Sequence, residues 1–178
     1  MSFPLANQRV QGYDPAQVDA LMDRVKIQFE NPRMSLVTSS ILEVARFDLV
    51  LGGYQVKAVD DAIAKVCDTL LERELKDFIL KSGRSAALEV LEENLEQIRK
   101  TLELGAKAAF PKSKSAYSPK RISNLFKSLS VRRGSLTGPS TFELRTMPLG
   151  RSASGKDKSA VDAFISTLVN SMLLQRLL

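Results

Sequence analysis

The stretch that decides the fold is Gly12-Tyr13-Asp14-Pro15-Ala16-Gln17-Val18-Asp19, which has the features of a complete helix start. Asp14 is a favourable N-cap, and Pro15 suits the first helical position because its fixed φ is already helical. Tyr13 before the cap and Val18 at the fourth helical position form a hydrophobic staple, the pair that sets the entry angle of the chain. The stretch therefore predicts a turn that leads directly into an α-helix.

The same element returns three more times along the chain. The copies are Gly53–Asp60, Ala116–Ser123 and a more divergent Gly155–Asp162, in which Lys156 replaces the tyrosine. A phenylalanine precedes each copy, so we expect one ancestral loop-plus-helix element copied four times. The residues that carry the repeat, all with an expected structural role, are Phe3, Gly12, Tyr13, Asp14, Val18, Asp19, Phe47, Gly53, Tyr54, Val59, Asp60, Phe110, Tyr117, Ile122, Phe142, Val161 and Asp162.

The four copies group into two halves. Phe3-Pro4 matches Phe110-Pro111, and Phe47-Asp48-Leu49 matches Phe142-Glu143-Leu144. The phenylalanine lies seven residues before the tyrosine in the second and third copies. The fourth copy then requires a longer Ser- and Gly-rich insertion after Phe142.

Past each motif, apolar residues recur at helical spacing. Ser118 before Pro119 and Asp157 repeat the capping logic of Asp14, for which Gln17 resembles a capping-box partner. A single helix of this kind cannot bury its apolar face alone, so it must pack on its own loop, on another copy or on another chain. The four faces comprise Val18, Leu21, Met22, Val25 and Phe29; Val59, Ile63, Val66 and Leu70; Ile122, Leu125, Phe126 and Leu129; and Val161, Phe164, Ile165, Leu168 and Met172.

The middle of the chain, from about 56 to 105, is helical in pattern with Ser82-Gly83 as its one breaker. After the breaker, Leu88, Leu91, Leu95, Ile98 and Leu102 alternate in steps of three and four, as in a coiled coil. Two interpretations stay open, a helical hairpin inside one chain or the seam of a dimer. The expected fold class is all-α, with tandem loop-plus-helix copies around this longer helical middle.

Composition narrows the chemistry of the protein. The 178 residues include no histidine and a single cysteine, Cys67. Histidine-based catalysis and histidine or cysteine metal sites are therefore excluded, and Cys67 is expected to be a small buried residue. Since a Gly-rich phosphate loop and a serine-based triad are absent too, we expect no enzyme, no catalytic or metal-binding residue and no cofactor.

The motif resembles the N-terminal domain of DivIVA, a scaffold of bacterial cell division and of the cell poles. Gly12–Val25 is the copy most similar to it, followed by Arg46–Tyr54 with Ala58-Val59-Asp60. In tandem, the copies are similar to the DivIVA-domain repeat proteins of actinobacteria. The resemblance covers most of the chain, as copies over residues 1–34, 35–82 (with an extended helix), 110–134 and 135–178, with a helical segment over 83–109.

The resemblance implies a non-enzymatic scaffold in cell division or polar growth. In that family each helix enters a parallel coiled-coil dimer, and a loop before Gly-Tyr inserts an apolar residue beside an arginine into the membrane. The corresponding pairs here are Val10-Gln11, Leu51-Gly52 and Ser115-Ala116, so only Leu51 is a good candidate for membrane contact. The implied partners are other division or growth proteins, an anionic membrane surface and a further copy of the chain, with a cytoplasmic location that reaches the inner face of the membrane at septum or pole.

Charge is distributed unevenly. Residues 1–105 carry 13 Lys+Arg against 17 Asp+Glu, whereas residues 106–178 carry 13 against 3. A basic half favours an anionic partner, so the alternative function is a nucleic-acid-binding module over 106–178. Nucleic acid is the less favoured partner, because the basic segments lack interleaved aromatic residues and a named motif.

Three terminal and surface features complete the expectations. No apolar run approaches the roughly 20 residues that span a bilayer, and residues 1–9 lack the pattern of a signal peptide. Ser135 after Arg132-Arg133-Gly134 is a candidate phosphorylation site within a Ser-rich linker. The apolar residues 172–178 are expected to pack into the core, with a short membrane contact as the alternative.

Overall fold

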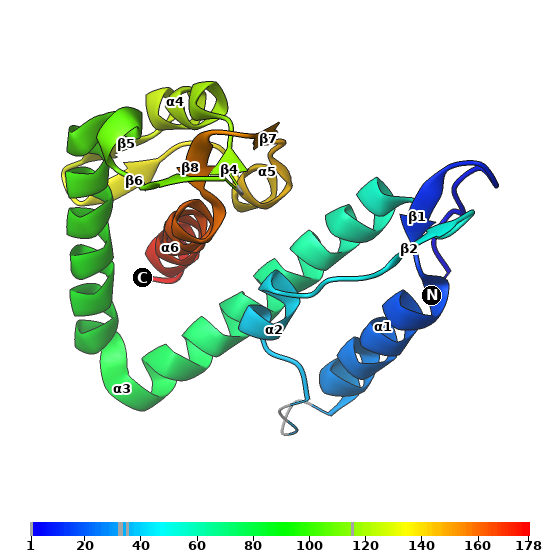
Figure 1. The fold of residues 1–178 in the computed structure, drawn as a ribbon. Coiled ribbons are helices and arrows are strands. Elements are labelled where there is room, and N and C mark those ends of the chain that lie inside the picture. The colour runs from blue at the N-terminus through cyan, green and yellow to red at the C-terminus, as the bar shows by residue number, and fades with distance from the viewer. Residues whose placement is uncertain (1, 32–33, 35, 115) are drawn as a thin grey trace. The chain divides into compact units, whose positions relative to one another are not determined.

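The computed structural model describes residues 2–31, 34, 36–114 and 116–178, and most of these are helical (Figure 1). The expectation of an all-α fold is only partly correct, because short antiparallel strands form small sheets among the described residues. The chain divides into two compact units, Met1–Leu71 and Glu72–Leu178. We call them the N-terminal and the C-terminal unit. Each unit contains two copies of the repeat.

The N-terminal unit contains β1 (Gln11–Tyr13), α1 (Pro15–Glu30), α2 (Ser39–Glu43), β2 (Leu49–Leu51) and the first part of α3 (Val56–Ala108). Strands β1 and β2 pair antiparallel, with Gly12 opposite Val50. Helices α1 and α3 lie side by side (Figure 1). Val18 and Val59 share a buried cluster near the helix starts, and Val25 shares another with Cys67 further along, so the two helices run parallel.

The helix starts follow the capping chemistry expected for Asp residues. The Asp14 carboxylate accepts the Ala16 N–H at 2.9 Å, and Asp157 accepts that of Ala160 at 3.0 Å. Ser118 makes no side-chain cap, contrary to the prediction. Gln17 is not a capping-box partner either, because its amide group exchanges two hydrogen bonds with Asp48, at 2.7 and 2.8 Å.

Helix α3 is interrupted where the sequence predicts a breaker. Gly83 has φ 86° and ψ 161°, and Gly105 has φ 71°, a left-handed region that suits glycine. Leu91, Leu95 and Ile98 are buried within the single chain. These three positions are therefore covered within the chain, whereas Leu88 of the same seam is 40% exposed. The helical hairpin and the seam of a dimer both stay predictions.

The C-terminal unit continues from α3 through β3 (Lys112–Ser113), β4 (Ala116–Tyr117), α4 (Pro119–Ser128), β5 (Ser130–Arg132), β6 (Ser135–Thr137), α5 (Thr141–Thr146), β7 (Arg151–Ser152), β8 (Gly155–Asp157) and α6 (Lys158–Leu177). Four of its strands form a sheet in the order β3-β8-β4-β7, and β5 pairs with β6 as a hairpin. Leu173 and Leu174 near the C-terminus are buried, so this end packs into the core, as expected.

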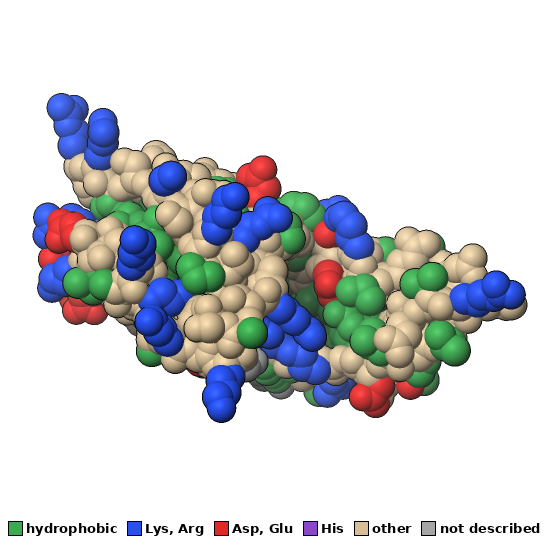
Figure 2. Space-filling model, turned by 45° about the horizontal axis from the view of Figure 1, so that its top comes forward, with side chains coloured by type: hydrophobic (Ala, Val, Ile, Leu, Met, Phe, Trp, Pro, Cys, Tyr) green, Lys and Arg blue, Asp and Glu red, His purple; other side chains and the backbone are tan. Residues whose placement is uncertain are grey.

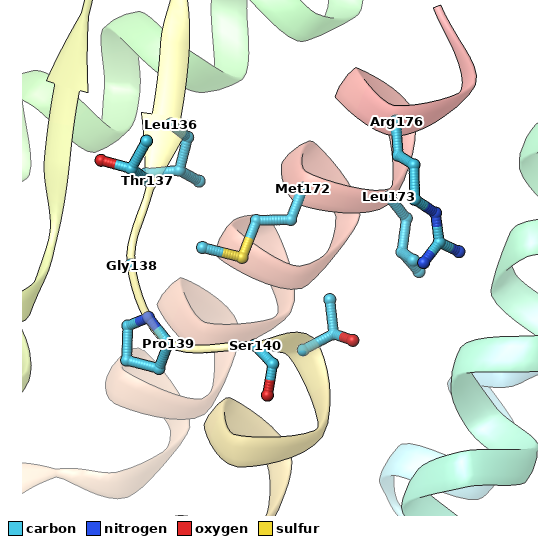
Figure 3. A pocket seen from close by; sticks show the side chains of 9 residues that line it. Leu136, Thr137, Gly138, Pro139, Ser140, Met172, Leu173 and Arg176 are labelled. Atoms are coloured by element: carbon cyan, nitrogen blue, oxygen red, sulfur yellow. The ribbon is translucent and has the colours of Figure 1, made fainter.

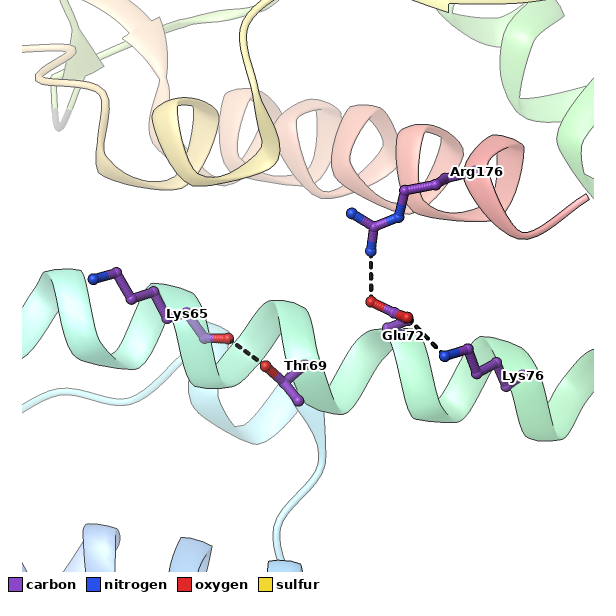
Figure 4. A network of polar contacts seen from close by, with 5 residues as sticks. All are labelled: Lys65, Thr69, Glu72, Lys76 and Arg176. Carbon is purple, nitrogen blue, oxygen red and sulfur yellow. Dashed lines mark hydrogen bonds and ion pairs between the residues drawn. The ribbon is translucent and has the colours of Figure 1, made fainter.

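An ion-pair network joins α6 to α3. The Arg176 guanidinium donates to Glu72 at 2.5 Å, and Lys76 donates to the same carboxylate at 2.7 Å (Figure 4). The hydrogen bond from Lys76 and the charge of Arg176 keep the pKa of Glu72 below its usual value. Because these groups are largely exposed, the network adds little stability. No helix in the described ranges combines the length and apolar character needed to cross a membrane.

Candidate functional site

The two Gly-Tyr motifs of the N-terminal unit cross each other. The Tyr13 N–H donates to the Tyr54 carbonyl at 2.9 Å, and the Tyr54 N–H donates back to the Tyr13 carbonyl at 2.8 Å. The loops upstream repeat this reciprocity, since Asp14 N–H donates to Asp48 and Gln55 N–H donates to Pro4, both at 2.9 Å. The first two copies are therefore related by an approximate two-fold axis inside one chain.

Both glycines are required by this crossing. A Cβ at Gly12 would lie 2.3 Å from the Tyr54 carbonyl oxygen, and one at Gly53 would lie 2.4 Å from that of Tyr13. These distances are far shorter than any real Cβ contact with backbone. Glycine is thus present at both positions for the close approach of two backbones, and neither Gly12 nor Gly53 has a positive φ.

The aromatic residues are exchanged between the copies. Tyr54 of the second copy packs edge-on against Phe3 of the first, at 5.4 Å between centroids, and Tyr13 packs against Phe47 at 5.1 Å. Val18 and Val59 are fully buried beneath the rings. The upstream phenylalanine of each copy thus completes the other copy, which favours formation of the pair over either copy alone.

The tyrosine hydroxyls are exchanged in the same way. The Tyr54 hydroxyl donates to Asp19 at 3.2 Å, and Tyr13 donates to Asp60. Partial burial, together with the charge and hydrogen bond of Asp60, raises the pKa of Tyr13 to about 12. Burial and the Asp19 hydrogen bond likewise raise the pKa of Tyr54. These aspartates therefore serve as acceptors for the partner tyrosine, in addition to any effect on the helix dipole.

The C-terminal unit repeats the crossing with substitutions. Tyr117 donates to Asp162 at 2.9 Å, as Tyr13 does to Asp60. A Cβ at Gly155 would lie 2.1 Å from the Tyr117 carbonyl oxygen, whereas Ala116 occupies the place of Gly12. Ile122 and Val161 are fully buried, like Val18 and Val59. The third and fourth copies thus form a second, modified crossing.

Lys156 occupies the place of Tyr54 and is buried. Its ammonium donates to the Lys107 carbonyl at 2.5 Å and to the Phe110 carbonyl at 2.8 Å. Phe110 itself packs against Phe126 and Phe164, at 5.8 and 5.6 Å between centroids. Lysine therefore replaces the aromatic interaction by binding carbonyl groups at the end of α3, that of Lys107 in its last turn and that of Phe110 just beyond it.

The upstream residue of the fourth copy is Leu149, not Phe142. Strand register decides this: Tyr13 lies opposite Leu49 and Tyr117 lies opposite Arg151, so the residue two positions before Arg151 matches Phe47. Leu149 is buried, whereas Phe142 lies in α5. The predicted insertion is consequently absent, because Leu149 precedes Lys156 by seven residues, as Phe47 precedes Tyr54. The seven-residue offset shared by the second, third and fourth copies is the feature of the sequence that identifies Leu149.

The two crossings differ at their exposed edges. In the N-terminal unit the cross-strand row is Leu5, Tyr54, Tyr13 and Leu49, with Leu5 and Leu49 at 61% and 51% exposure. In the C-terminal unit the matching row is Lys112, Lys156, Tyr117 and Arg151, with exposed cations at both ends. Sequence reasoning found neither pair of edge residues, since cross-strand register is needed to place them.

More apolar side chains adjoin the first row. Leu51, the predicted contact residue, is 68% exposed, and Val10 is 54% exposed. They belong to the paired strand region, where Gly52 N–H donates to the Val10 carbonyl at 3.0 Å. Together with Leu5 and Leu49 they form what we call the apolar tip. Arg9 is exposed beside it.

The candidate phosphorylation site lies in a tight hairpin. Ser135 begins β6 opposite Arg132, across a turn in which Arg133 and Gly134 have φ of 51° and 73°. The hairpin is fixed to α6 because Gln175 accepts the Leu136 N–H at 2.8 Å. A kinase that binds its substrate in extended form would have to open this hairpin. Phosphorylation of Ser135 stays a prediction.

A cavity of about 360 Å³ lies beside Gly138 and Pro139, between this hairpin and α6 (Figure 3). Leu136 and Met172 line its apolar side. Its charged lining residue, Arg176, is paired with Glu72. Within the described residues no cluster of three or more Asp, Glu and Cys could hold a metal ion. The cavity is therefore a space between the hairpin and α6 whose charged residue is already paired, and we assign it no function.

Comparison with protein-family models, with curated proteins and with solved structures gives no match for this chain.

Proposed function

We propose that the protein is a non-enzymatic adaptor that binds an anionic membrane surface through the apolar tip and holds other proteins there. The observation that carries the proposal is the cluster of four exposed apolar side chains, Leu5, Val10, Leu49 and Leu51, on one crossing. Clusters of this kind mark sites of protein or membrane contact. The resemblance of the first two copies to the DivIVA domain supports a role in bacterial cell division or polar growth.

Rigidity of the tip supports membrane contact. The two backbones are tied by reciprocal hydrogen bonds at Tyr13 and Tyr54, and at Gly12 and Gly53 they approach so closely that a Cβ would not fit. The apolar side chains are therefore held outward before binding, so little conformational entropy is lost on contact. A single chain supplies both halves of the arrangement, which the resemblance otherwise assigns to two chains.

The expected affinity is modest. Each apolar side chain contributes about 0.8–1.5 kcal/mol when roughly half of its surface is transferred out of water. Arg9 adds about 1 kcal/mol near an anionic surface. The neighbouring acid Asp48 is held by Gln17, with its carboxylate 2.7 Å from the amide nitrogen. Binding should therefore be reversible and should require both apolar insertion and negative lipid.

Vesicle sedimentation tests the proposal. The full chain should bind vesicles that contain phosphatidylglycerol and bind neutral phosphatidylcholine vesicles much less. Leu5→Gln with Leu51→Gln should abolish most binding. The matched control is Leu80→Gln, because Leu80 is 82% exposed in α3 and lies outside the tip.

Equal binding by the double variant and the unchanged chain would exclude the tip as the membrane contact. Loss of binding in the Leu80→Gln control as well would point to nonspecific adsorption and count equally against the proposal. A fluorescent fusion adds the cellular test: septal or polar enrichment that the double variant loses is expected, and uniform fluorescence of the unchanged fusion contradicts the proposed role.

A further inference from the structure

The C-terminal unit contains a long stretch without acids. Residues 104–142 include eight Lys and Arg and no Asp or Glu. In three dimensions this stretch forms β3, β4, helix α4, the β5–β6 hairpin and the start of α5. Figure 2 shows Lys and Arg side chains spread over the part of the surface that this unit forms. The positive charge is thus concentrated on folded elements rather than in a solvated linker.

Helix α4 orders these charges along one face. Ile122 and Leu125 are buried on its inner side, whereas Lys120, Arg121 and Lys127 are exposed. Lys120 and Lys127 lie about two turns apart and share the outer face of a helix about 15 Å long, and Arg121 lies at the side of that face.

The row of cations continues beyond both ends of α4. Arg151 lies before the start of α4, because β7 pairs with β4. Arg132 and Arg133 follow its end in the hairpin. We call the six cations Arg151, Lys120, Arg121, Lys127, Arg132 and Arg133 the basic track.

The track is not neutralised from within. Throughout the ranges that the structure describes, none of its six cations forms an ion pair. The three acids of residues 106–178 have internal tasks: Asp157 caps α6, Asp162 accepts from Tyr117, and Glu143 accepts the N–H and hydroxyl of Ser140, both at 2.8 Å. The field of the track is therefore available to an external anion.

A groove runs beside the track. A cavity of about 300 Å³ is lined by Arg121, Asn124 and Ser128 on the α4 side and by residues of the α5 region, Glu143 among them, on the other. Arg121 and Asn124 carry donors suited to phosphate oxygens, whereas the Ser128 hydroxyl donates to the Leu125 carbonyl at 2.7 Å. The Glu143 carboxylate accepts hydrogen bonds from Ser140 in the capping box of α5. It therefore does not occupy the donors on the α4 side of the groove.

We propose that the basic track binds the phosphate backbone of double-stranded nucleic acid. A duplex carries one negative charge per about 1.7 Å of its axis, so a helix about 15 Å long with flanking arginines meets several phosphates at once. The contact is expected to be independent of base sequence. It lies on a different unit from the apolar tip and does not depend on the membrane function.

Two observations favour a duplex over other anions. Among the described residues of the C-terminal unit, the exposed large apolar side chains are Leu80, Leu88 and Leu104, all in α3, and the six cations of the track bring none that could insert into lipid. The track also offers no free aromatic platform for stacking single-stranded bases. The Tyr117 ring lies beneath the Lys158 ammonium at 5.5 Å, and Phe126 packs against Phe164 at 5.6 Å.

Fluorescence anisotropy with a labelled duplex of mixed sequence, measured over a range of salt concentrations, tests the proposal on the full chain. The logarithm of affinity should fall linearly with the logarithm of salt, by about 0.9 for each phosphate contacted. The variant Lys120→Gln, Arg121→Gln, Lys127→Gln should bind at least about tenfold more weakly at low salt, and its slope should be smaller by about 3. Circular dichroism checks that this surface variant is folded.

The matched control removes three charges elsewhere, as Arg24→Gln, Lys26→Gln, Lys81→Gln. All three side chains are exposed and lie in α1 or α3. This control should keep the slope of the unchanged chain. The proposal is overturned if the two variants lose affinity equally, if the unchanged chain shows no salt-dependent duplex binding, or if the α4 variant loses anionic-vesicle binding while duplex binding is unchanged.

Discussion

The two crossings of this chain share a backbone plan and differ in surface chemistry. The same cross-strand row ends in Leu5 and Leu49 in the N-terminal unit and in Lys112 and Arg151 in the C-terminal unit. Buried positions changed less, since Val18, Val59, Ile122 and Val161 are all fully buried. The two crossings thus share the buried residues that hold two copies together and differ in the side chains at their exposed edges.

The largest expected effect concerns the glycines of the two crossings. Gly12→Ala places a Cβ about 2.3 Å from the Tyr54 carbonyl oxygen, so the N-terminal unit should lose roughly 3 kcal/mol of stability. Ala116→Gly, at the matching position of the other crossing, should cost at most about 1 kcal/mol. Denaturant titrations of both variants measure the difference. A loss of at most about 1 kcal/mol in Gly12→Ala, no larger than in Ala116→Gly, would contradict the close approach of the two backbones at residue 12.

Lys156 gives the next largest expected effect. Lys156→Met removes the ammonium that binds the partly buried Lys107 carbonyl and the buried Phe110 carbonyl, and the loss of these bonds should cost about 2 kcal/mol. Thermal unfolding followed by circular dichroism is the measurement. Lys158→Met is the comparison, since Lys158 covers only the Tyr117 ring and should cost about 0.5 kcal/mol. A melting temperature unchanged by Lys156→Met would refute the capping role of this lysine.

An intermediate effect is expected at alkaline pH. The folded protein holds the Tyr13 proton more tightly than the unfolded chain does, with a pKa of about 12 against 10.0. The stability that Tyr13 contributes is therefore complete below pH 10 and is lost as pH rises from 10 towards 12. This difference between the folded and unfolded pKa values corresponds to at most about 2.7 kcal/mol of stability. Solvent screening of this half-buried group lowers the expected loss to about 1 kcal/mol.

Unfolding titrations on both sides of this pH window measure the loss. The Tyr13→Phe variant should lack the part that belongs to this hydroxyl. An identical pH profile in the variant and the unchanged chain would contradict the assignment.

The smallest effect on stability is expected when the apolar residues at the ends of the N-terminal cross-strand row are replaced by the cations of the C-terminal row. Leu5→Lys with Leu49→Arg gives the apolar row the charges of the basic row, and both sites are exposed, so stability should change by less than about 0.5 kcal/mol. Vesicle binding should nevertheless become more sensitive to salt and lose part of its apolar component, since Val10 and Leu51 remain exposed. If the variant binds vesicles with the same salt dependence as the unchanged chain, Leu5 and Leu49 do not contact the membrane.

Local features of the fold are predictable from the sequence because they depend on near neighbours. The caps at Asp14 and Asp157, the buried faces of α1 and α6 and the break at Gly83 follow from propensity and spacing. The Asp carboxylate must meet N–H groups two or three residues away, so the sequence alone contains this information.

The crossing and its sheets are not predictable in the same way. Phe3 meets Tyr54 and Gly12 meets Gly53, and only tertiary pairing of the copies brings such distant residues together. The same limit explains why the sequence predicts Asp14 as the partner of Gln17, whereas the structure pairs Gln17 with Asp48. It also explains why the sequence predicts Phe142 as the upstream residue of the fourth copy, a place that Leu149 occupies. Exposure of Leu5 and Leu49 follows from the register of that pairing, which a repeat motif does not specify.

The central claim is that two Gly-Tyr motifs of one chain bind each other reciprocally. Residue-resolved hydrogen exchange, followed by NMR at low concentration where the chain is a monomer by light scattering, tests it most directly. The amides of Tyr13 and Tyr54, which donate to each other's carbonyls, should exchange about as slowly as those in the buried turns of α1. Exchange of both amides at the rate of an unstructured peptide, with α1 still protected, would contradict the claim.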